Sequence, residues 1–466
     1  MRSRFLHPSY SKNKKRWKFF LDSYVGGDEW LTSDNMFKFG REDANDYKTR
    51  IGRAAYFNYC RPVIDTYTAF IFGADQRVTR DLKDPGWDTF AKDVDLRGNP
   101  IDDFMQDISM WGQMQGHVGI LVDQPQKDDK IITLADVREA GLRTFLTIYP
   151  ALSIVDWSLD RFGAFKWVRL AESERNDADP MNTTQRPTAL YRVWTRDKWF
   201  IHDEDAKVIA GADHSLGVVP FIMHYFDRHP TSNLIGIGIL QDIARINRMM
   251  VNVISYIDEF VAKQAFPFLA EEEAEAVQPE EARQISANNV YGYPEGTHPP
   301  QYISPPIDPA EFMKVYVQDF LTRQIFRLAK LETRVLMEQS GVAKQMDFME
   351  TDAALTRYAR RLERTEESIQ RVWGLWEGRQ VEPMVDYPDS YDIGTLEETL
   401  KNALDVVALY TDQSPTMISE HLKTVATRLQ PKMEEDVRKV IDGELEEAVV
   451  VEQQAAAFDR AIRDAA

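Results

Sequence analysis

The chain contains almost no cysteine and no long hydrophobic segment. Cys60 is the only cysteine among 466 residues, which excludes an intramolecular disulfide and any zinc site built from cysteines. No apolar run reaches the roughly 18 residues that a membrane-spanning helix needs. No apolar stretch follows the basic N-terminal residues, so we expect no secretory signal peptide.

Basic residues are also in deficit. The chain has 56 Lys and Arg against 75 Asp and Glu, for a net charge of −19. A protein that coats nucleic acid should be basic, because phosphate neutralisation provides most of that binding. An acidic protein can still handle DNA by repelling it instead of adhering to it.

The common catalytic motifs are missing as well. The sequence has no phosphate-binding GxxxxGKS/T loop, no GxSxG, no HExxH and no EF-hand loop. Gly236-Ile237-Gly238 lacks the third glycine of a dinucleotide fingerprint, and a nucleotide site there is disfavoured. His224 and His229 flank Asp227, but we expect a strand residue and a loop residue instead of a metal site. We expect no enzyme activity, cofactor or metal.

The composition that remains is typical of a folded protein of two to four domains, with 43% hydrophobic residues. Residues 1–21 are basic, and apolar spacing predicts a helix over 43–74, with a kink or break at Pro62, and another over 101–117. Residues 131–225 form a strand-rich block. Its expected strands lie at 144–148, 154–157, 165–170, 191–194 and 220–222, with a polar loop at 177–187, and a short strand at 120–122 precedes the block.

A helix with a narrow apolar repeat is predicted over 235–264. Its apolar residues step alternately by four and three positions, a 3.5-residue repeat that suits lengthwise packing against copies of the same helix. Burial in the core of the chain itself is the alternative. The repeat consists of Ile239, Ile243, Ile246, Met250, Val253, Ile257 and Phe260.

Two further helices follow an interruption at 265–307, where an acidic cluster precedes a short strand at 290–291 and five prolines. The first helix covers 308–332 and carries Phe312, Tyr316, Phe320, Ile325, Leu328 and Leu331. After a break at Ser340-Gly341, the second begins with Asp347 as N-cap and ends near Gly378. One face of it carries Leu355, Tyr358, Leu362, Ile369, Val372, Trp373 and Trp376. Amphipathic stretches follow near 395–410, 415–429 and 432–463.

The order of several weak landmarks is more specific than any one of them. In this order and spacing the chain resembles the portal proteins of tailed bacteriophages over nearly its whole length. The landmarks are Tyr24 with Gly26-Gly27, Tyr47-x-x-Arg50, Phe57-Asn58, Phe70-Ile71-Phe72, Gly116-His117, Gly119, Leu121-Val122-Asp123, Tyr149-Pro150, Val155-Asp156-Trp157, Gly217-x-x-Pro220-Phe221 and Ser340-Gly341-Val342-Ala343.

The resemblance implies an α+β, mainly α fold with named parts. These are a wing at 1–234, stem helices at 235–264 and 308–332, a clip at 265–307, a tunnel loop at 333–348, a long channel helix and return at 349–395, and a crown at 396–466. It assigns the 3.5-residue repeat to contacts between copies in the stem. It implies that partners dock at the clip through Glu271, Glu272, Glu273 and Glu275. The tunnel loop carries Val335, Leu336, Met337, Glu338, Gln339, Lys344, Gln345, Met346, Asp347 and Phe348.

The function implied is a closed ring, dodecameric in that family, at one vertex of a virion capsid. Double-stranded DNA would pass through it without sequence recognition during packaging and ejection. The implied partners are the terminase large subunit, a head-tail adaptor or connector, and the major capsid and scaffolding proteins, with assembly in the bacterial cytoplasm and no membrane. A helical interaction scaffold unrelated to phage and a carboxylate-based hydrolase remain alternatives.

Overall fold

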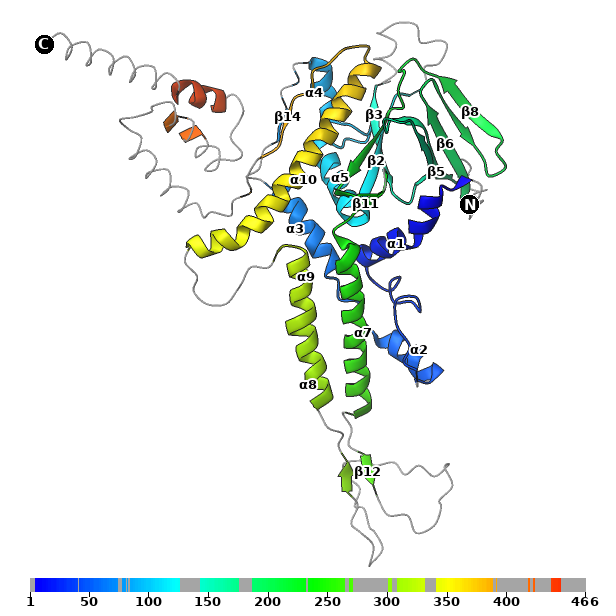
Figure 1. Cartoon of the computed structure of the whole chain (residues 1–466), viewed down its shortest axis with the longest axis vertical. Helices are drawn as coiled ribbons and strands as arrows, with labels where there is room; N and C mark the ends of the chain where they lie inside the picture. The colour runs from blue at the N-terminus through cyan, green and yellow to red at the C-terminus, as the bar shows by residue number, and fades with distance from the viewer. Residues whose placement is uncertain are drawn as a thin grey trace, which may run out of the picture. The chain divides into compact units, whose positions relative to one another are not determined.

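The structure is a computed structural model of the chain (Figure 1). It describes residues 5–40, 42–73, 78–80, 82, 84–125, 143–175, 187–231, 234–264, 268–270, 301–303, 308–331, 341–388, 391, 418–419, 422–423 and 437–445. Only the backbone is described at 262–264, 268–270, 301–303, 308–310 and 341–348. The chain divides into two compact units. Unit 1 comprises Met1–Leu21, Arg61–Gln241 and Lys330–Ala466, and unit 2 comprises Asp22–Cys60 and Asp242–Ala329.

Unit 1 contains two larger antiparallel sheets. The first has the strand order β3-β2-β9, formed by His117–Asp123 (β2), Phe145–Pro150 (β3) and Phe221–Tyr225 (β9). The second is a five-stranded meander in sequence order (Figure 1). Its strands are Ile154–Leu159 (β4), Phe165–Glu174 (β5), Thr188–Thr195 (β6), Lys198–His202 (β7) and Val208–Asp213 (β8).

Short strand pairs and helices complete unit 1. Thr79–Arg80 (β1) pairs with Val385–Asp386 (β14), and Asp227–Arg228 (β10) pairs with Gly236–Ile237 (β11). The helices are Pro8–Val25 (α1), whose last turn falls in unit 2, Cys60–Phe72 (α3), Pro85–Ala91 (α4), Ile101–Gln115 (α5) and Gly341–Trp376 (α10).

The core of unit 1 forms where α10 packs on α5, β2 and β9 (Figure 1). The face of α10 that the sequence predicted is confirmed: five of its seven residues are buried, and Val372 and Trp376 pack against the cluster. Trp373 lies edge-on to Trp87 of α4, with ring centroids 5.4 Å apart. Burial of large aromatic side chains provides most of the stabilisation of such a core.

A glycine contact brings the end of α5 against β11. α5 ends at Gly116, whose φ of 90° is a left-handed conformation that favours glycine. A Cβ atom at Gly236 would overlap the carbonyl oxygen of Gly116, and one at Gly238 would lie 2.5 Å from the carbonyl oxygen of Gln113. The Gly-x-Gly pair therefore serves close backbone packing.

Unit 2 contains a helical pair. Leu240–Gln264 (α7) lies beside a second helical stretch made of Asp308–Val315 (α8), the π-helical Tyr316–Leu321 (η2) and Thr322–Leu328 (α9) (Figure 1). The Tyr316 hydroxyl lies 3.9 Å from the sulfur of Met249 on α7. The strands Phe268–Ala270 (β12) and Gln301–Ile303 (β13) pair with each other, and Ala44–Arg53 (α2) completes the unit.

Mixed helix and sheet confirms the α+β class, and three helix boundaries differ from the prediction. The helix expected over 43–74 is two helices, α2 and α3, and Pro62 lies in the first turn of α3, where proline is tolerated. The helix expected from 235 begins at Leu240, because Gly236–Ile237 is held in a strand pair. α10 begins at Gly341, so Asp347 is not an N-cap: the helix-forming residues from Val342 to Met346 continue the helix.

Several predicted segments lie outside the described residues. These are the polar loop at 177–186, the acidic cluster with Glu271, Glu272, Glu273 and Glu275, the strand at 290–291, residues 332–340, and nearly all of 396–466.

The glycine contact predicts a strong effect of a single methyl group. Gly236→Ala should destabilise unit 1 by about 1–3 kcal/mol, because the added Cβ forces the backbone of Gly116 to move. Thermal unfolding of the variant measures this. Gly40→Ala is the control, since nothing lies within 4 Å of its added Cβ. Equal melting temperatures for both variants would contradict the close packing.

Candidate assembly surface

The apolar repeat predicted on α7 is only partly covered in the chain. Ile243 and Met250 are fully buried, whereas Ile246, Val253 and Ile257 are half-buried. Ile239 precedes the helix and packs against the core of unit 1. Part of the repeat thus faces the chain's own core, and part is left accessible.

The second helical stretch has two apolar rows, and only one of them is buried. Val317, Leu321, Ile325 and Ala329 recur every four residues and are buried. A four-residue step drifts around an ordinary α-helix of 3.6 residues per turn. The wider π-helical turn at η2 lessens that drift over its length, which helps to keep the row on one side.

The other row is aromatic, with two exposed rings on either side of a half-buried one. Phe312, Tyr316 and Phe320 stack along the helix, with ring centroids 6.5 and 5.4 Å apart and nearly parallel planes. Phe312 is 72% exposed and Phe320 is 51% exposed. We call these three residues the aromatic row.

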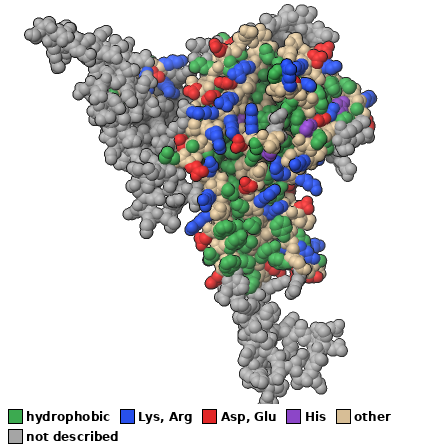
Figure 2. Space-filling model, viewed as in Figure 1, with side chains coloured by type: hydrophobic (Ala, Val, Ile, Leu, Met, Phe, Trp, Pro, Cys, Tyr) green, Lys and Arg blue, Asp and Glu red, His purple; other side chains and the backbone are tan. Residues whose placement is uncertain are grey.

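More exposed apolar side chains lie on both helices of the pair. Figure 2 shows apolar side chains gathered over this part of the chain. Single exposed apolar residues are ordinary, but a contiguous patch indicates a surface that meets a partner. The exposed members besides the aromatic row are Met249, Val261, Val315, Phe326 and Leu328.

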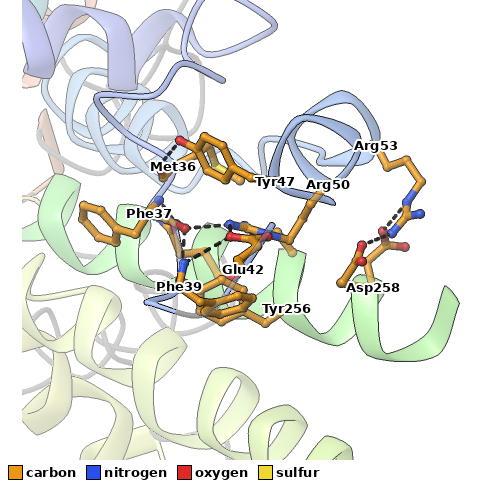
Figure 3. A network of polar contacts seen from close by, with 12 residues as sticks. Met36, Phe37, Phe39, Glu42, Tyr47, Arg50, Arg53, Tyr256 and Asp258 are labelled. Carbon is orange, nitrogen blue, oxygen red and sulfur yellow. Dashed lines mark hydrogen bonds and ion pairs between the residues drawn. The ribbon is translucent and has the colours of Figure 1, made fainter. Parts of the chain in front are cut away.

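A buried arginine fastens α2 and the segment before it to α7 (Figure 3). The Arg50 side chain is fully buried and pairs with Glu42, with Nε donating to Oε1 at 2.7 Å. It also donates to the Phe37 carbonyl at 2.6 Å and to the Ser255 hydroxyl of α7 at 2.8 Å. The hydrogen bonding of Glu42 with Arg50 holds the pKa of the Glu42 carboxyl below its usual value.

Aromatic rings enclose the same guanidinium. The Arg50 Cζ lies 5.0 Å from the ring centroid of Phe39, 5.5 Å from that of Tyr47 and 4.9 Å from that of Tyr256 on α7 (Figure 3). Cation–π contacts of this kind strengthen when water is excluded. A planar guanidinium suits this combination of paired hydrogen bonds and stacking, and a lysine does not.

Neighbouring polar contacts extend the attachment along α7. Asn252 accepts a hydrogen bond from the Phe37 amide at 2.7 Å and donates one to the Asn35 carbonyl at 2.9 Å. One turn further on, Arg53 pairs with Asp258 at 3.2 Å and also with Glu259 (Figure 3). One side of α7 is therefore occupied by polar contacts within unit 2.

The two candidate histidines do not form a metal site. His224 is a strand residue of β9 and His229 follows β10, as predicted. The His224 ring hydrogen-bonds the Thr365 and Tyr358 hydroxyls of α10 at 2.8 and 3.1 Å. Across the described residues, no group of three or more His, Cys, Asp or Glu is placed to hold a metal ion. His224 therefore has a structural role in the core of unit 1.

The remaining predicted site residues are placed only in part. Lys344, Gln345, Met346, Asp347 and Phe348 lie in the first turns of α10, where the structure describes the backbone. Val335, Leu336, Met337, Glu338 and Gln339 and the four clip glutamates lie outside the described residues.

Sequence reasoning missed the role of Arg50. Tyr47-x-x-Arg50 was noticed only as a landmark. None of the helices in the described ranges is both long and apolar enough to cross a bilayer.

Comparisons with known proteins give similarity to solved structures only. No protein-family model matches the chain, and no curated protein matches its sequence. It is similar to a chain in the neck of an empty gene transfer agent particle computed with C6 symmetry, with a TM-score of 0.44 and 9% identity over 84% of this chain and 95% of that one.

Two other solved structures give similar values. A chain in the virion of a native gene transfer agent particle has a TM-score of 0.42 and 8% identity, over 85% of this chain and 94% of that one. A chain in the neck of the native particle computed with C12 symmetry has a TM-score of 0.40 and 11% identity, over 80% and 90%. At these values we argue function from the chain's own residues.

Loss of Arg50 should detach α2 from α7. Arg50→Met leaves Glu42 buried without its partner, and breaking a buried ion pair costs about 3–5 kcal/mol. Urea unfolding should show this loss, and hydrogen exchange should show faster exchange in α2. Arg53→Met is the matched control, because Arg53 is itself partly exposed and its pairs with Asp258 and Glu259 are less deeply buried than the Arg50–Glu42 pair, so their loss should cost less. A control loss as large as that of Arg50→Met would contradict the central role of Arg50.

Two buried histidines predict acid sensitivity of unit 1. Burial lowers the pKa of His224 and of His117 from 6.5 to about 3. The folded state therefore favours neutral rings, and their full contribution to stability is present above pH 6.5. It is lost as pH falls from 6.5 toward 3, by about 1.4 kcal/mol per pH unit for each histidine. The melting temperature should fall less steeply with decreasing pH in His224→Gln than in the wild type. In His229→Gln it should fall as steeply as in the wild type. Equal dependence of the melting temperature on pH in both variants would show that His224 is not the origin of the acid sensitivity.

Proposed function

We propose that this chain is the subunit of a bacteriophage-type portal: a closed ring at one capsid vertex through which double-stranded DNA enters and leaves the particle. The observation that carries the proposal is the exposed aromatic row on η2 and α8, lying on the helical pair that the ordered sequence landmarks assign to the stem. Copies of the same chain are the partners that would cover it.

A ring follows from the form of this surface. Both helices of the pair expose apolar side chains, Met249 and Val261 on α7 and the aromatic row on the other helix. When one patch meets a different patch on the next copy, the contact repeats from copy to copy and closes into a ring if the rotation permits. Helices packed lengthwise bury the most apolar surface in such a contact.

The other parts keep the roles that the resemblance implies, as proposals. The acidic segment with Glu271, Glu272, Glu273 and Glu275 docks the terminase large subunit and later a head-tail adaptor. Its charge favours basic partner surfaces and makes docking sensitive to salt. The residues from Val335 to Phe348 form the constriction of the channel. They mix acids, Lys344 and apolar side chains, so they contact DNA without holding its phosphates tightly.

Ring formation should depend on the aromatic row. Phe312→Ser combined with Phe320→Ser removes two rings that are more than half exposed and leaves the buried row from Val317 to Ala329 unchanged. The subunit should therefore fold and stay monomeric while the wild-type chain forms rings. Native mass spectrometry measures the distribution of masses. These positions are better than Ile246 and Val253, because the latter are half-buried on α7 and their change would disturb the subunit itself.

The matched control is Phe162→Ser, which removes an 80% exposed ring from the β4–β5 turn in unit 1. It should leave the rings intact. Rings of unchanged size in the double variant would show that the aromatic row does not form the contact between copies. A wild-type chain that stays monomeric would contradict the proposed function. An interaction scaffold would not close into one ring of fixed size.

A further inference from the structure

The first helix carries a concentration of positive charge that the proposed ring does not use. Residues 1–21 hold seven Lys and Arg and no Asp or Glu, in a chain where acids outnumber bases by 75 to 56. Five of the seven lie in α1, between Lys12 and Lys18. A segregated basic segment in an acidic protein indicates an anionic partner.

The inner face of α1 is packed firmly into unit 1. Tyr10, Trp17 and Phe20 are buried. The Tyr10 hydroxyl donates to the Leu152 carbonyl at 3.0 Å, and the Trp17 ring lies edge-on to that of His117 with centroids 5.1 Å apart. The helix is therefore a fixed platform for the side chains on its other face.

The outer face presents lysines to solvent. Lys12, Lys14, Lys15 and Lys18 are all exposed. Lys12 and Lys15 are three residues apart and share one side of the helix, and Lys14 lies next to Lys15 around the helix. Lys14 lies 5.9 Å from the Tyr10 ring centroid. No acid of the described chain forms an ion pair with Lys12, Lys14 or Lys15. We call these three residues the lysine face.

We propose that the lysine face of α1 binds the phosphate backbone of double-stranded DNA, without sequence specificity. The step per residue along a helix is 1.5 Å, so side chains three residues apart are separated by about 4.5 Å along the axis, and flexible lysines can reach successive phosphates. Each phosphate neutralised by a lysine releases a counterion from the DNA. The proposal rests on the proposed function only in that a portal ring meets DNA.

Two other anionic partners fit the lysine face less well. A helix that binds a membrane surface inserts aromatic and aliphatic side chains between the lipids. Of the large rings of α1, however, Tyr10, Trp17 and Phe20 are buried in the protein and Phe19 is half-buried. The centre of a protein interface is depleted of lysine and rich in aromatic residues, whereas the outer face of α1 presents lysines and Ser11. Charge without apolar contact matches a phosphate backbone.

The experiment measures binding of the full-length chain to a fluorescent mixed-sequence DNA duplex by anisotropy, over a series of salt concentrations. Lys12→Glu, Lys14→Glu and Lys15→Glu are combined in one variant. Wild type should bind at low salt and weaken steeply as salt rises. The variant should bind at least about tenfold more weakly, with a salt slope shallower by about one for each lysine that contacts phosphate.

The matched control combines Lys166→Glu, Lys198→Glu and Lys207→Glu, three exposed lysines of the five-stranded sheet region. It changes the net charge by the same amount and should keep the wild-type affinity and slope. Equal loss in both variants would assign the effect to net charge and overturn the proposal. So would a wild-type chain that does not bind the duplex, or that binds anionic phospholipid vesicles or polyglutamate as tightly as DNA.

Native mass spectrometry of the same samples separates this inference from the proposed function. Intact rings that fail to bind DNA through α1 overturn the inference alone. A monomeric chain whose DNA binding needs the lysine face overturns the ring and leaves the inference standing.

Discussion

The structure of unit 2 depends on one constraint: a helix in water has to cover its apolar side. The second helical stretch carries two apolar rows, and the chain covers only the one that includes Val317, Leu321 and Ile325. In the aromatic row Phe312 and Phe320 remain largely in solvent, and their exposed apolar surface costs free energy that contact with a partner would recover. The proposed ring would supply that contact.

The polar contacts of Arg50 bear on the same constraint. They occupy one side of α7 through Ser255 and Tyr256 and fix the segment from Asn35 to Arg50 against it. A buried ion pair whose hydrogen bonds are all made adds little net stability, but it favours one arrangement of the segments that it joins. With that side of α7 occupied, the exposed apolar residues of the pair are the ones available to other copies in the proposed ring.

The sequence predicted those elements whose apolar spacing is regular and whose apolar side is buried. The face of α10 from Leu355 to Trp376 and the helix α5 are of this kind. β7 and β8 were missed, because Val208–Asp213 has no alternation of polar and apolar residues and is exposed along most of its length. A kink or break was expected at Pro62, but the break between α2 and α3 lies at 54–59, and Pro62 is tolerated in the first turn of α3.

The sequence predicted the apolar residues of the candidate surface but not which of them are exposed. The spacing of Phe312, Tyr316 and Phe320 was visible in the sequence, but spacing does not tell which of two apolar rows the chain itself buries. That depends on the tertiary partner α7 and on the π-helical turn at η2. Arg50 was beyond sequence reasoning, because arginine is rarely buried without a partner and Glu42 stands at no helical spacing from it.

The most direct test of the central claim is electron microscopy of the purified full-length chain. Class averages should show closed rings of one rotational symmetry, with the stretch from α8 to α9 at the contact between neighbouring copies and the aromatic row buried there. Single subunits at micromolar concentration, or rings whose contacts leave Phe312 and Phe320 in solvent, would contradict the account.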